Sequence, residues 1–226
     1  MRRAARMPPT SHSALRKSIV KAVFFDYDGV LTTDKTGTLT TNRFLSRQTA
    51  IPYESLVAAF RKHNVDLNAG MATYADIWPA VCTSLGRELP QELLVAAFES
   101  TPLNDEMLRL ARNLKTRYAV GIITDNKKDR IDHLRKYQGL DEVFAPIVVS
   151  AEIGHTKSSS AIFEHALASL ELSPQECVFI DNTPSNLVVA TKLGMGTIHF
   201  DDETNDVPNL VARLRSEYGV SVEPAA

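Results

Sequence analysis

The chain has 226 residues, a formal net charge of −2 at pH 7 and a hydrophobic content of 44%. This length fits one sizeable domain or a domain with a smaller insertion, and the nearly balanced charge argues against a nucleic-acid partner. Its two cysteines, Cys82 and Cys177, are far apart, so we expect neither a disulfide framework nor a zinc site. No apolar run approaches the roughly 18 residues that span a bilayer. We therefore expect a soluble cytoplasmic protein, monomeric or homodimeric, without a membrane partner.

Residues 1–18 differ in composition from the rest of the chain. They are basic, contain no acidic residue and include Pro8 and Pro9. They lack the apolar core of a signal peptide and the sustained amphipathic period of a transit peptide. We expect them to form a disordered tail.

Short apolar runs alternate with amphipathic helical patterns from residue 19 onward. Strands are predicted at residues 19–25, 119–123, 147–149, 177–180 and 197–200. Helices are predicted where apolar residues recur three and four positions apart, at 107–114 and 162–170, and where Thr183 and Pro184 provide a helix start. This alternation predicts an α/β fold, a Rossmann-like parallel sheet with helices on both faces.

Residues 36–103 interrupt the alternation, because they carry helical patterns and no convincing strand. Three apolar faces recur at helical spacing: Leu56, Val57 and Phe60; Tyr74, Ile77, Trp78 and Val81; and Leu93, Leu94, Ala97 and Phe98. Prolines and glycines separate them. We predict a small all-helical insertion after the first strand, with residues 19–35 and 104–220 forming the α/β core. The aromatic stripe is expected to be the interior of this insertion.

Two carboxylates, Asp26 and Asp28, follow the first predicted strand directly, and Gly29 comes next. The carboxyl end of a strand is where open α/β sheets bind ligands, and side chains two apart in an extended chain point the same way. Paired carboxylates serve in glycoside cleavage, in metal binding or in forming an aspartyl-phosphate. The spacing alone leaves these three uses open.

Three further polar motifs follow later strands. Thr124, Asp125 and Asn126 end the second strand, where a hydroxyl and free N–H groups at a helix start suit a phosphate. Lys157 precedes a helix and is suited to neutralising negative charge. Asp181 ends the fourth strand, where an acid is a fitting ligand for a hard cation such as Mg²⁺.

Residues 24–32, Phe-Phe-Asp-Tyr-Asp-Gly-Val-Leu-Thr, followed by these motifs in this order, resemble the haloacid dehalogenase-like (HAD) phosphatase superfamily over about residues 20–202. The helical insertion and the loop at 154–157 are most similar to the subfamily with a helical cap (subfamily I, C1-type), which includes sugar-phosphate phosphatases and the phosphatase domain of soluble epoxide hydrolase. The resemblance implies a Mg²⁺-dependent phosphatase acting on a small phosphorylated metabolite through an aspartyl-phosphate, with residues 36–103 as the cap.

The same resemblance implies roles for individual residues. Asp26 is the expected nucleophile, Asp28 the general acid and base, and Lys157 the catalytic cation. Thr124, Asp125 and Asn126 are the expected substrate-binding residues. Asp26, the backbone carbonyl of Asp28, and Asp181 are the expected magnesium ligands. Two positions depart from the family pattern, because Asn182 replaces a second acid and Ser158 replaces a proline.

Asp34 begins a second signature, Asp-Lys-Thr-Gly-Thr-Leu-Thr, which looks like the phosphorylation sequence of P-type ATPases, distant members of the same superfamily. Asp34 does not follow a buried strand directly, and Thr36 stands where a second acid is needed, so we expect Asp26 to be the nucleophile and residues 34–40 to be a linker into the cap. A phosphomutase and a non-catalytic phospho-ligand binding module remain alternatives to the phosphatase. Substrate specificity is expected to lie in cap residues such as Arg43, Arg47, Arg61, Tyr74 and Trp78.

Overall fold

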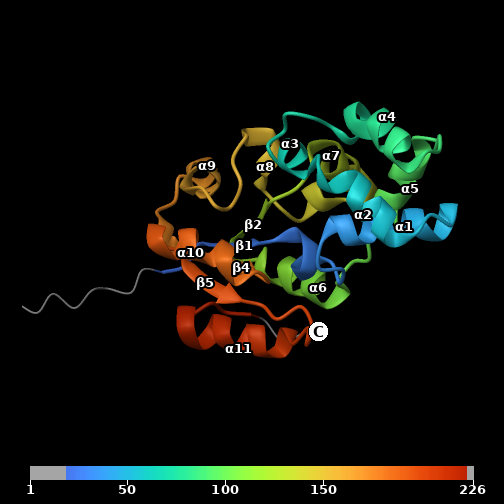
Figure 1. Cartoon of the computed structure of the whole chain (residues 1–226). Helices are drawn as coiled ribbons and strands as arrows, with labels where there is room; N and C mark the ends of the chain where they lie inside the picture. Colours follow the sequence, from blue (N-terminus) through green and yellow to red (C-terminus); the bar gives the residue numbers. More distant parts are fainter. Residues whose placement is uncertain (1–18, 223–226) are drawn as a thin grey trace, which may run out of the picture.

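The computed structural model describes residues 19–222, so the predicted tail at 1–18 lies outside the described part of the chain. Five parallel strands form one sheet in the order β3-β2-β1-β4-β5 (Figure 1). Their bounds are β1 (Ala22–Phe25), β2 (Ala119–Thr124), β3 (Ile147–Val149), β4 (Cys177–Asp181) and β5 (Gly196–His199). All five predicted strands are confirmed, and the first begins three residues later than expected.

Both faces of the sheet are buried, which follows from the apolar strand sequences. Val23 and Phe25 belong to one hydrophobic cluster, and Ala22 and Phe24 belong to a second. The first cluster includes residues of α6 (Asp105–Leu114), α7 (Lys128–Tyr137) and α11 (Val207–Tyr218). The second includes residues of α9 (Ser160–Leu170) and α10 (Pro184–Leu193). Helices therefore cover both faces, as predicted.

Between the turn Tyr27–Leu31 that follows β1 and helix α6, the chain forms five helices and no strand. They are α1 (Gly37–Thr49), α2 (Tyr53–Arg61), α3 (Asn64–Asn68), α4 (Tyr74–Leu85) and α5 (Glu92–Glu99). We call residues 37–99 the helical insertion; Figure 1 shows α1, α2, α4 and α5 gathered to one side of the sheet.

Aromatic packing forms the interior of the helical insertion. The Tyr74 ring lies 5.8 Å from Phe60 and 5.3 Å from Phe98, measured between centroids. Trp78 is 5% exposed and its indole N–H donates to the Leu89 carbonyl at 2.9 Å. Since buried aromatic groups with satisfied donors are typical core residues, the expectation that this stripe is interior rather than a ligand site is confirmed.

Helix α1 was not anticipated, because residues 34–40 were expected to be a linker. The helix begins at Gly37, and the Thr36 hydroxyl caps it by accepting from the Leu39 N–H. Its buried residues include Thr40, Thr41 and Asn42. A helix whose buried face is partly polar has no apolar period, which is the signal on which a sequence-based assignment depends.

The remaining elements are short. Helix α8 (Ser150–Ile153) follows β3, and 3₁₀ turns occur at Leu140–Glu142 and Pro174–Glu176. Within residues 19–222, no helix is long and apolar enough to cross a membrane.

Candidate active site

Asp26 and Asp181 mark the carboxyl ends of two adjacent strands, β1 and β4. The chain leaves β1 toward β2 on one side and leaves β4 toward β5 on the other, so the two strands form the topological switch point at which open α/β sheets bind ligands. The backbone N–H of Asp26 donates to the Ile180 carbonyl at 2.8 Å and keeps the two strand ends in register.

Lys157 joins these two carboxylates. Its ammonium lies 2.8 Å from Asp26 Oδ2 and 2.7 Å from Asp181 Oδ2, and the whole residue is 1% exposed. The Asp125 carboxylate accepts from the Lys157 backbone N–H at 2.8 Å, which anchors the loop that carries the lysine. Lys157 therefore contacts the candidate nucleophile, as expected. A lysine in a loop is ordinarily solvated, so this burial is unusual.

Burial and charge act in opposite directions on this group of residues. Burial raises the pKa of the Asp26 carboxyl, and Lys157 opposes that rise. Burial also disfavours the Lys157 ammonium, but Asp26, Asp181 and Asp125 outweigh it and raise the pKa of the lysine. Lys157 consequently stays charged at neutral pH.

Asp181 has further partners on its own strand-to-helix turn. Its Oδ1 accepts from the Thr183 N–H at 2.7 Å, and the Asn186 amide lies 3.2 and 3.1 Å from its two oxygens. The neighbouring Asn182, which stands where the family has an acid, donates to Asp202 at 3.3 Å. It also packs on Gly29, where a Cβ would lie 2.2 Å from the Asn182 amide nitrogen and the backbone φ is +80°. Gly29 is thus required both for its conformation and for space.

Asp28 is held by a buried arginine that the sequence analysis missed. Arg130 on α7 is 0% exposed, and its two terminal nitrogens each donate to one Asp28 oxygen at 2.9 Å. The Asn126 amide donates to Asp28 Oδ2 at 2.8 Å and accepts from Arg130 at 2.9 Å. Asp28, Asn126 and Arg130 form a closed ring of hydrogen bonds that orients the Asp28 carboxylate.

Arg130 lies in the charged run Lys127-Lys128-Asp129-Arg130, a pattern typical of a solvated helix start. One signal was present, because Arg130 is four residues after Asn126 and therefore falls on the same side of the helix that follows. That spacing says nothing about which residue the guanidinium meets, since Asp28 is 102 positions away in the chain.

The Thr124-Asp125-Asn126 segment ends β2 beside these groups. The Asn126 backbone N–H donates to Ser150 Oγ at 3.0 Å, and its amide approaches the Thr124 hydroxyl at 3.4 Å. Asp125, expected to contact substrate, is committed through Oδ1 to the Lys157 loop. All three predicted residues lie near the carboxylates, and their contact with a substrate stays a prediction.

A cavity of about 350 Å³ opens over this cluster, which we call the catalytic pocket. Five of the predicted residues line it: Asp26, Asp28, Thr124, Asp125 and Lys157. The other lining residues had not been assigned a catalytic or substrate-binding role from the sequence. They come from the start of α1, from α3 and from the strand ends: Lys35, Thr36, Gly37, Thr38, Asn64, Asn68, Lys127, Asn182, Thr183 and Asn186.

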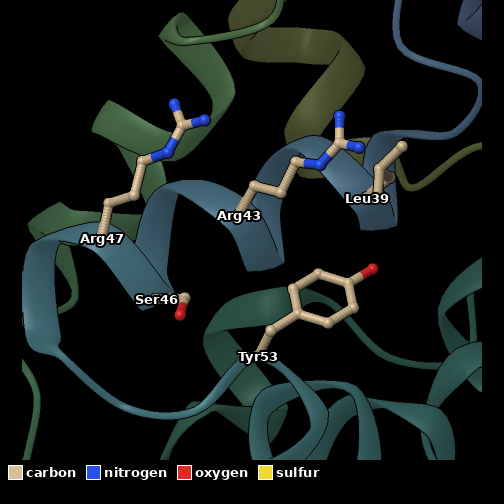
Figure 2. Close-up of a pocket in the computed structure, with 5 residues that line it drawn as sticks. All are labelled: Leu39, Arg43, Ser46, Arg47 and Tyr53. Atoms are coloured by element: carbon tan, nitrogen blue, oxygen red, sulfur yellow. The ribbon is translucent and has the colours of Figure 1, made fainter.

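The five residues expected to set specificity do not line the catalytic pocket. Arg43 and Arg47 lie on successive turns of α1 and line a separate cavity of about 400 Å³ with Leu39, Ser46 and Tyr53 (Figure 2). Tyr74 and Trp78 are buried inside the helical insertion, and Arg61 is exposed at the end of α2. The structure therefore does not support that expectation, because residue type alone does not say whether a side chain faces the catalytic pocket, the interior of the insertion or another cavity.

Asp34, the competing nucleophile, is engaged in holding α1. Its two oxygens accept from the Thr40 hydroxyl at 2.8 Å and from Arg43 at 2.9 Å, and it is not among the residues that line the catalytic pocket. This arrangement favours Asp26 over Asp34 as the reacting carboxylate.

The oxygen donors at the strand ends suit a hard divalent cation. Within residues 19–222, no three His, Cys, Asp or Glu side chains gather into a ready-made metal cage. Mg²⁺ commonly takes only one or two carboxylates from the protein and completes its shell with water and phosphate oxygens. Asp26 and Asp181 already direct one oxygen each at a common positive charge, the Lys157 ammonium, so the residues fit such an ion.

Comparison with known proteins agrees with this architecture. The sequence matches the haloacid dehalogenase-like hydrolase family over residues 20–194. The chain belongs to this family of hydrolases. It is 28% identical to bifunctional epoxide hydrolase 2 of Rattus norvegicus over 214 residues, which cover 84% of this chain and 38% of the rat protein. It therefore spans less than two fifths of the length of that relative.

A second relative is the sesquiterpene phosphatase astK of Aspergillus oryzae, 29% identical over 119 residues that cover 50% of this chain and 61% of the fungal protein. Among solved structures, a HAD-like hydrolase from Porphyromonas gingivalis superposes with a TM-score of 0.71 at 21% identity, over 88% of this chain and all of the other. A HAD family enzyme from Bacteroides thetaiotaomicron, solved with magnesium and inorganic phosphate, gives a TM-score of 0.63 at 19% identity, covering 80% of this chain and 93% of that one. These likenesses establish the HAD-like fold.

Proposed function

We propose that this HAD-like hydrolase is a Mg²⁺-dependent phosphatase that cleaves a small phosphomonoester through an aspartyl-phosphate on Asp26. The observation that carries the proposal is that Asp26 and Asp28 line one pocket at the switch point of the sheet while the buried Lys157 pairs with Asp26. The phosphatase relative from Aspergillus oryzae and the magnesium and phosphate bound by a structural neighbour support the reaction class.

In the first step, a carboxylate oxygen of Asp26 attacks phosphorus while the ester P–O bond breaks. A phosphate monoester dianion repels a carboxylate, so the positive charge of Lys157 beside Asp26 is needed to bring them together. The lysine is already in place, because Asp181 and the Asp125-anchored loop hold it there.

Asp28 carries out the proton transfers of both steps. In its protonated form it donates a proton to the departing alcohol oxygen, and the resulting carboxylate then accepts a proton from the water whose oxygen attacks phosphorus and releases Asp26. The products are the alcohol and inorganic phosphate. Arg130 and Asn126 fix the direction of the Asp28 carboxylate, which keeps it aligned for both transfers.

Asp26, Asp181 and the Asp28 backbone carbonyl would hold Mg²⁺, which supplies further shielding of phosphate charge. Among the described residues, Lys157 is the only cation within ion-pair distance of Asp26 and Asp181. The replacement of an acid by Asn182 leaves the protein's side of this site with less negative charge.

We further propose that the helical insertion acts as a cap and contributes to the pocket, with residues 36–103 as the cap and 19–35 with 104–220 as the core. Asn64 and Asn68 of α3 line the catalytic pocket. The Tyr74 N–H donates to Asp129 at 2.8 Å, and His133 lies 3.0 Å from Glu99, so the insertion packs against α7. A cap of this kind excludes bulk water from the first step.

The test is phosphate release from a broad panel of phosphomonoesters with and without Mg²⁺. Asp26→Asn is expected to abolish turnover at unchanged melting temperature, and Asp34→Asn serves as the matched control because Asp34 lies outside the pocket. Turnover by Asp26→Asn together with its loss in Asp34→Asn would transfer the nucleophile to Asp34. Isomerisation of a sugar phosphate without phosphate release would instead identify a phosphomutase.

A further inference from the structure

The chemistry of the pocket wall restricts the leaving group. Ligand pockets are usually lined mostly by apolar and aromatic side chains. In contrast, none of the described residues lining the catalytic pocket has a large apolar side chain; they are charged residues, amides, threonines and one glycine. An apolar leaving group would gain little burial here and would strip water from polar groups without replacing their hydrogen bonds.

Lys127 is the unusual member of this wall. It is 8% exposed and lines the pocket, yet within residues 19–222 no carboxylate lies within ion-pair distance of its ammonium. Burial lowers the pKa of Lys127 to about 8, and the nearby Arg130 adds to that effect. A lysine that is mostly buried and has no ion-pair partner among the described residues destabilises the protein without substrate, and an anion in the pocket would relieve that cost.

The other cations near the reacting groups have carboxylate partners. Lys157 is shared between Asp26 and Asp181, and Arg130 is paired with Asp28. Lys35 also lines the pocket, but its side chain is 57% exposed and its ammonium lies 3.8 Å from Asp202. Lys127 directly follows Asn126, whose amide binds Asp28, and Asp28 is the carboxylate that most strongly attracts it. In the proposed mechanism Asp28 faces the departing oxygen, so Lys127 stands on the leaving-group side of the pocket.

Neutral hydrogen-bonding groups also line the pocket. Thr36 and Thr38 line it from the start of α1, and Asn64 and Asn68 line it from α3. The Asn68 side-chain oxygen is buried and has no hydrogen-bond partner in the described part of the chain. An acceptor of this kind matches a hydroxyl group of a ligand.

We infer that the substrate of this enzyme is a small hydrophilic phosphomonoester whose leaving group carries a second anionic group, a carboxylate or a second phosphate, bound by Lys127. The inference rests on the proposed function and deepens it. It also separates this pocket from one suited to a long hydrocarbon such as a sesquiterpene, the substrate class in the name of the Aspergillus relative.

The experiment compares kcat/KM for three kinds of phosphate ester: phosphorylated hydroxy acids and sugar bisphosphates, their neutral counterparts (the amide of the acid, the sugar monophosphate), and farnesyl phosphate. Loss of a hydrogen bond to a charged group changes binding by about tenfold to a hundredfold. We therefore expect the doubly anionic esters to exceed their neutral counterparts by at least about tenfold, mainly through KM, and farnesyl phosphate to be the poorest substrate.

Lys127→Met is expected to reduce that preference to near one, and Lys127→Arg to retain part of it. Lys128→Met is the matched control, because Lys128 is the adjacent exposed lysine, paired with Asp132, and its replacement should leave the preference as in wild type. If Lys127→Met lowers kcat/KM equally for a doubly anionic ester and for its neutral counterpart, the lysine contacts the transferred phosphoryl group and the inference is overturned. A preference of the wild-type enzyme for farnesyl phosphate would also overturn it.

A binding measurement distinguishes a failure of this inference from a failure of the proposed function. If no ester is hydrolysed, calorimetric binding of the same phosphorylated hydroxy acid and its amide still tests the pocket. Tighter binding of the acid that disappears in Lys127→Met would uphold the inference, and equal binding of acid and amide would refute it.

Discussion

The first prediction concerns the ion pair between Arg130 and Asp28, which we expect to hold the Asp28 carboxylate in place. Arg130→Met keeps an unbranched apolar stem but removes the guanidinium that binds both oxygens of Asp28, the Asn126 amide oxygen and, at 3.3 Å, the Thr101 hydroxyl. It leaves the Asp28 carboxylate, whose side chain is 13% exposed, with the Asn126 amide as its remaining partner among these groups.

Removing one partner of a buried ion pair costs about 3–5 kcal/mol of unfolding free energy. Asp28 also faces the pocket, where water partly solvates it, so we expect the lower end of that range, about 3 kcal/mol. Asp28→Asn is expected to destabilise as well, because it leaves a fully buried guanidinium with less compensation. The double variant should lose less than the sum, with a coupling energy of about 2 kcal/mol.

Urea unfolding of wild type, both single variants and the double variant measures this coupling. Arg135→Met is the control, because Arg135 lies on the same helix but forms partly exposed ion pairs with Asp141 and Glu152, and such pairs are worth about 1 kcal/mol or less. Additivity of Arg130→Met and Asp28→Asn within about 0.5 kcal/mol would refute the idea that the arginine holds the carboxylate.

Three further outcomes are expected. Gly37→Ala would ordinarily favour a helix start, but its Cβ would lie 2.4 Å from the Arg130 guanidinium carbon; we expect a lower melting temperature in the wild-type background, and no further decrease when Gly37→Ala is added to Arg130→Met. Because burial lowers the pKa of Lys127 from 10.5 to about 8, the unfolded chain binds more protons between those values, so this group makes stability rise with pH across that window. Lys127→Met should therefore be more stable than wild type at pH 7, by about 3 kcal/mol, with the difference vanishing above pH ~10.5; a variant that melts below wild type at pH 7 contradicts this. Lys157→Met leaves Asp26 and Asp181 facing each other, so we expect kcat/KM for any ester cleaved by wild type to fall about a hundredfold or more, and near-normal kcat/KM would remove Lys157 from the mechanism.

The sequence by itself determined the sheet and pointed to the candidate reacting groups. Strands such as 119–123 and 177–180 were recognisable because a strand buried on both faces is a short continuous apolar run. Asp26, Asp28, Thr124 and Asp125 stood out because polar residues at the carboxyl ends of such strands meet at one edge of the sheet. Lys157 and the expected roles of all five residues came from the order of the motifs and their resemblance to the HAD superfamily.

The surroundings of these groups were decided only by tertiary structure. Arg130 and Lys127 belong to one charged run, yet the first is buried against Asp28 and the second lines the pocket with no carboxylate of residues 19–222 at ion-pair distance. Arg43 and Arg47 look equally suited to bind an anion but line a different cavity. The physical reason is that the role of a charged side chain depends on what the folded chain places within a few ångströms of it, because charge interactions are strong only at short range and away from water, and neither the neighbour nor the burial is encoded in the local sequence.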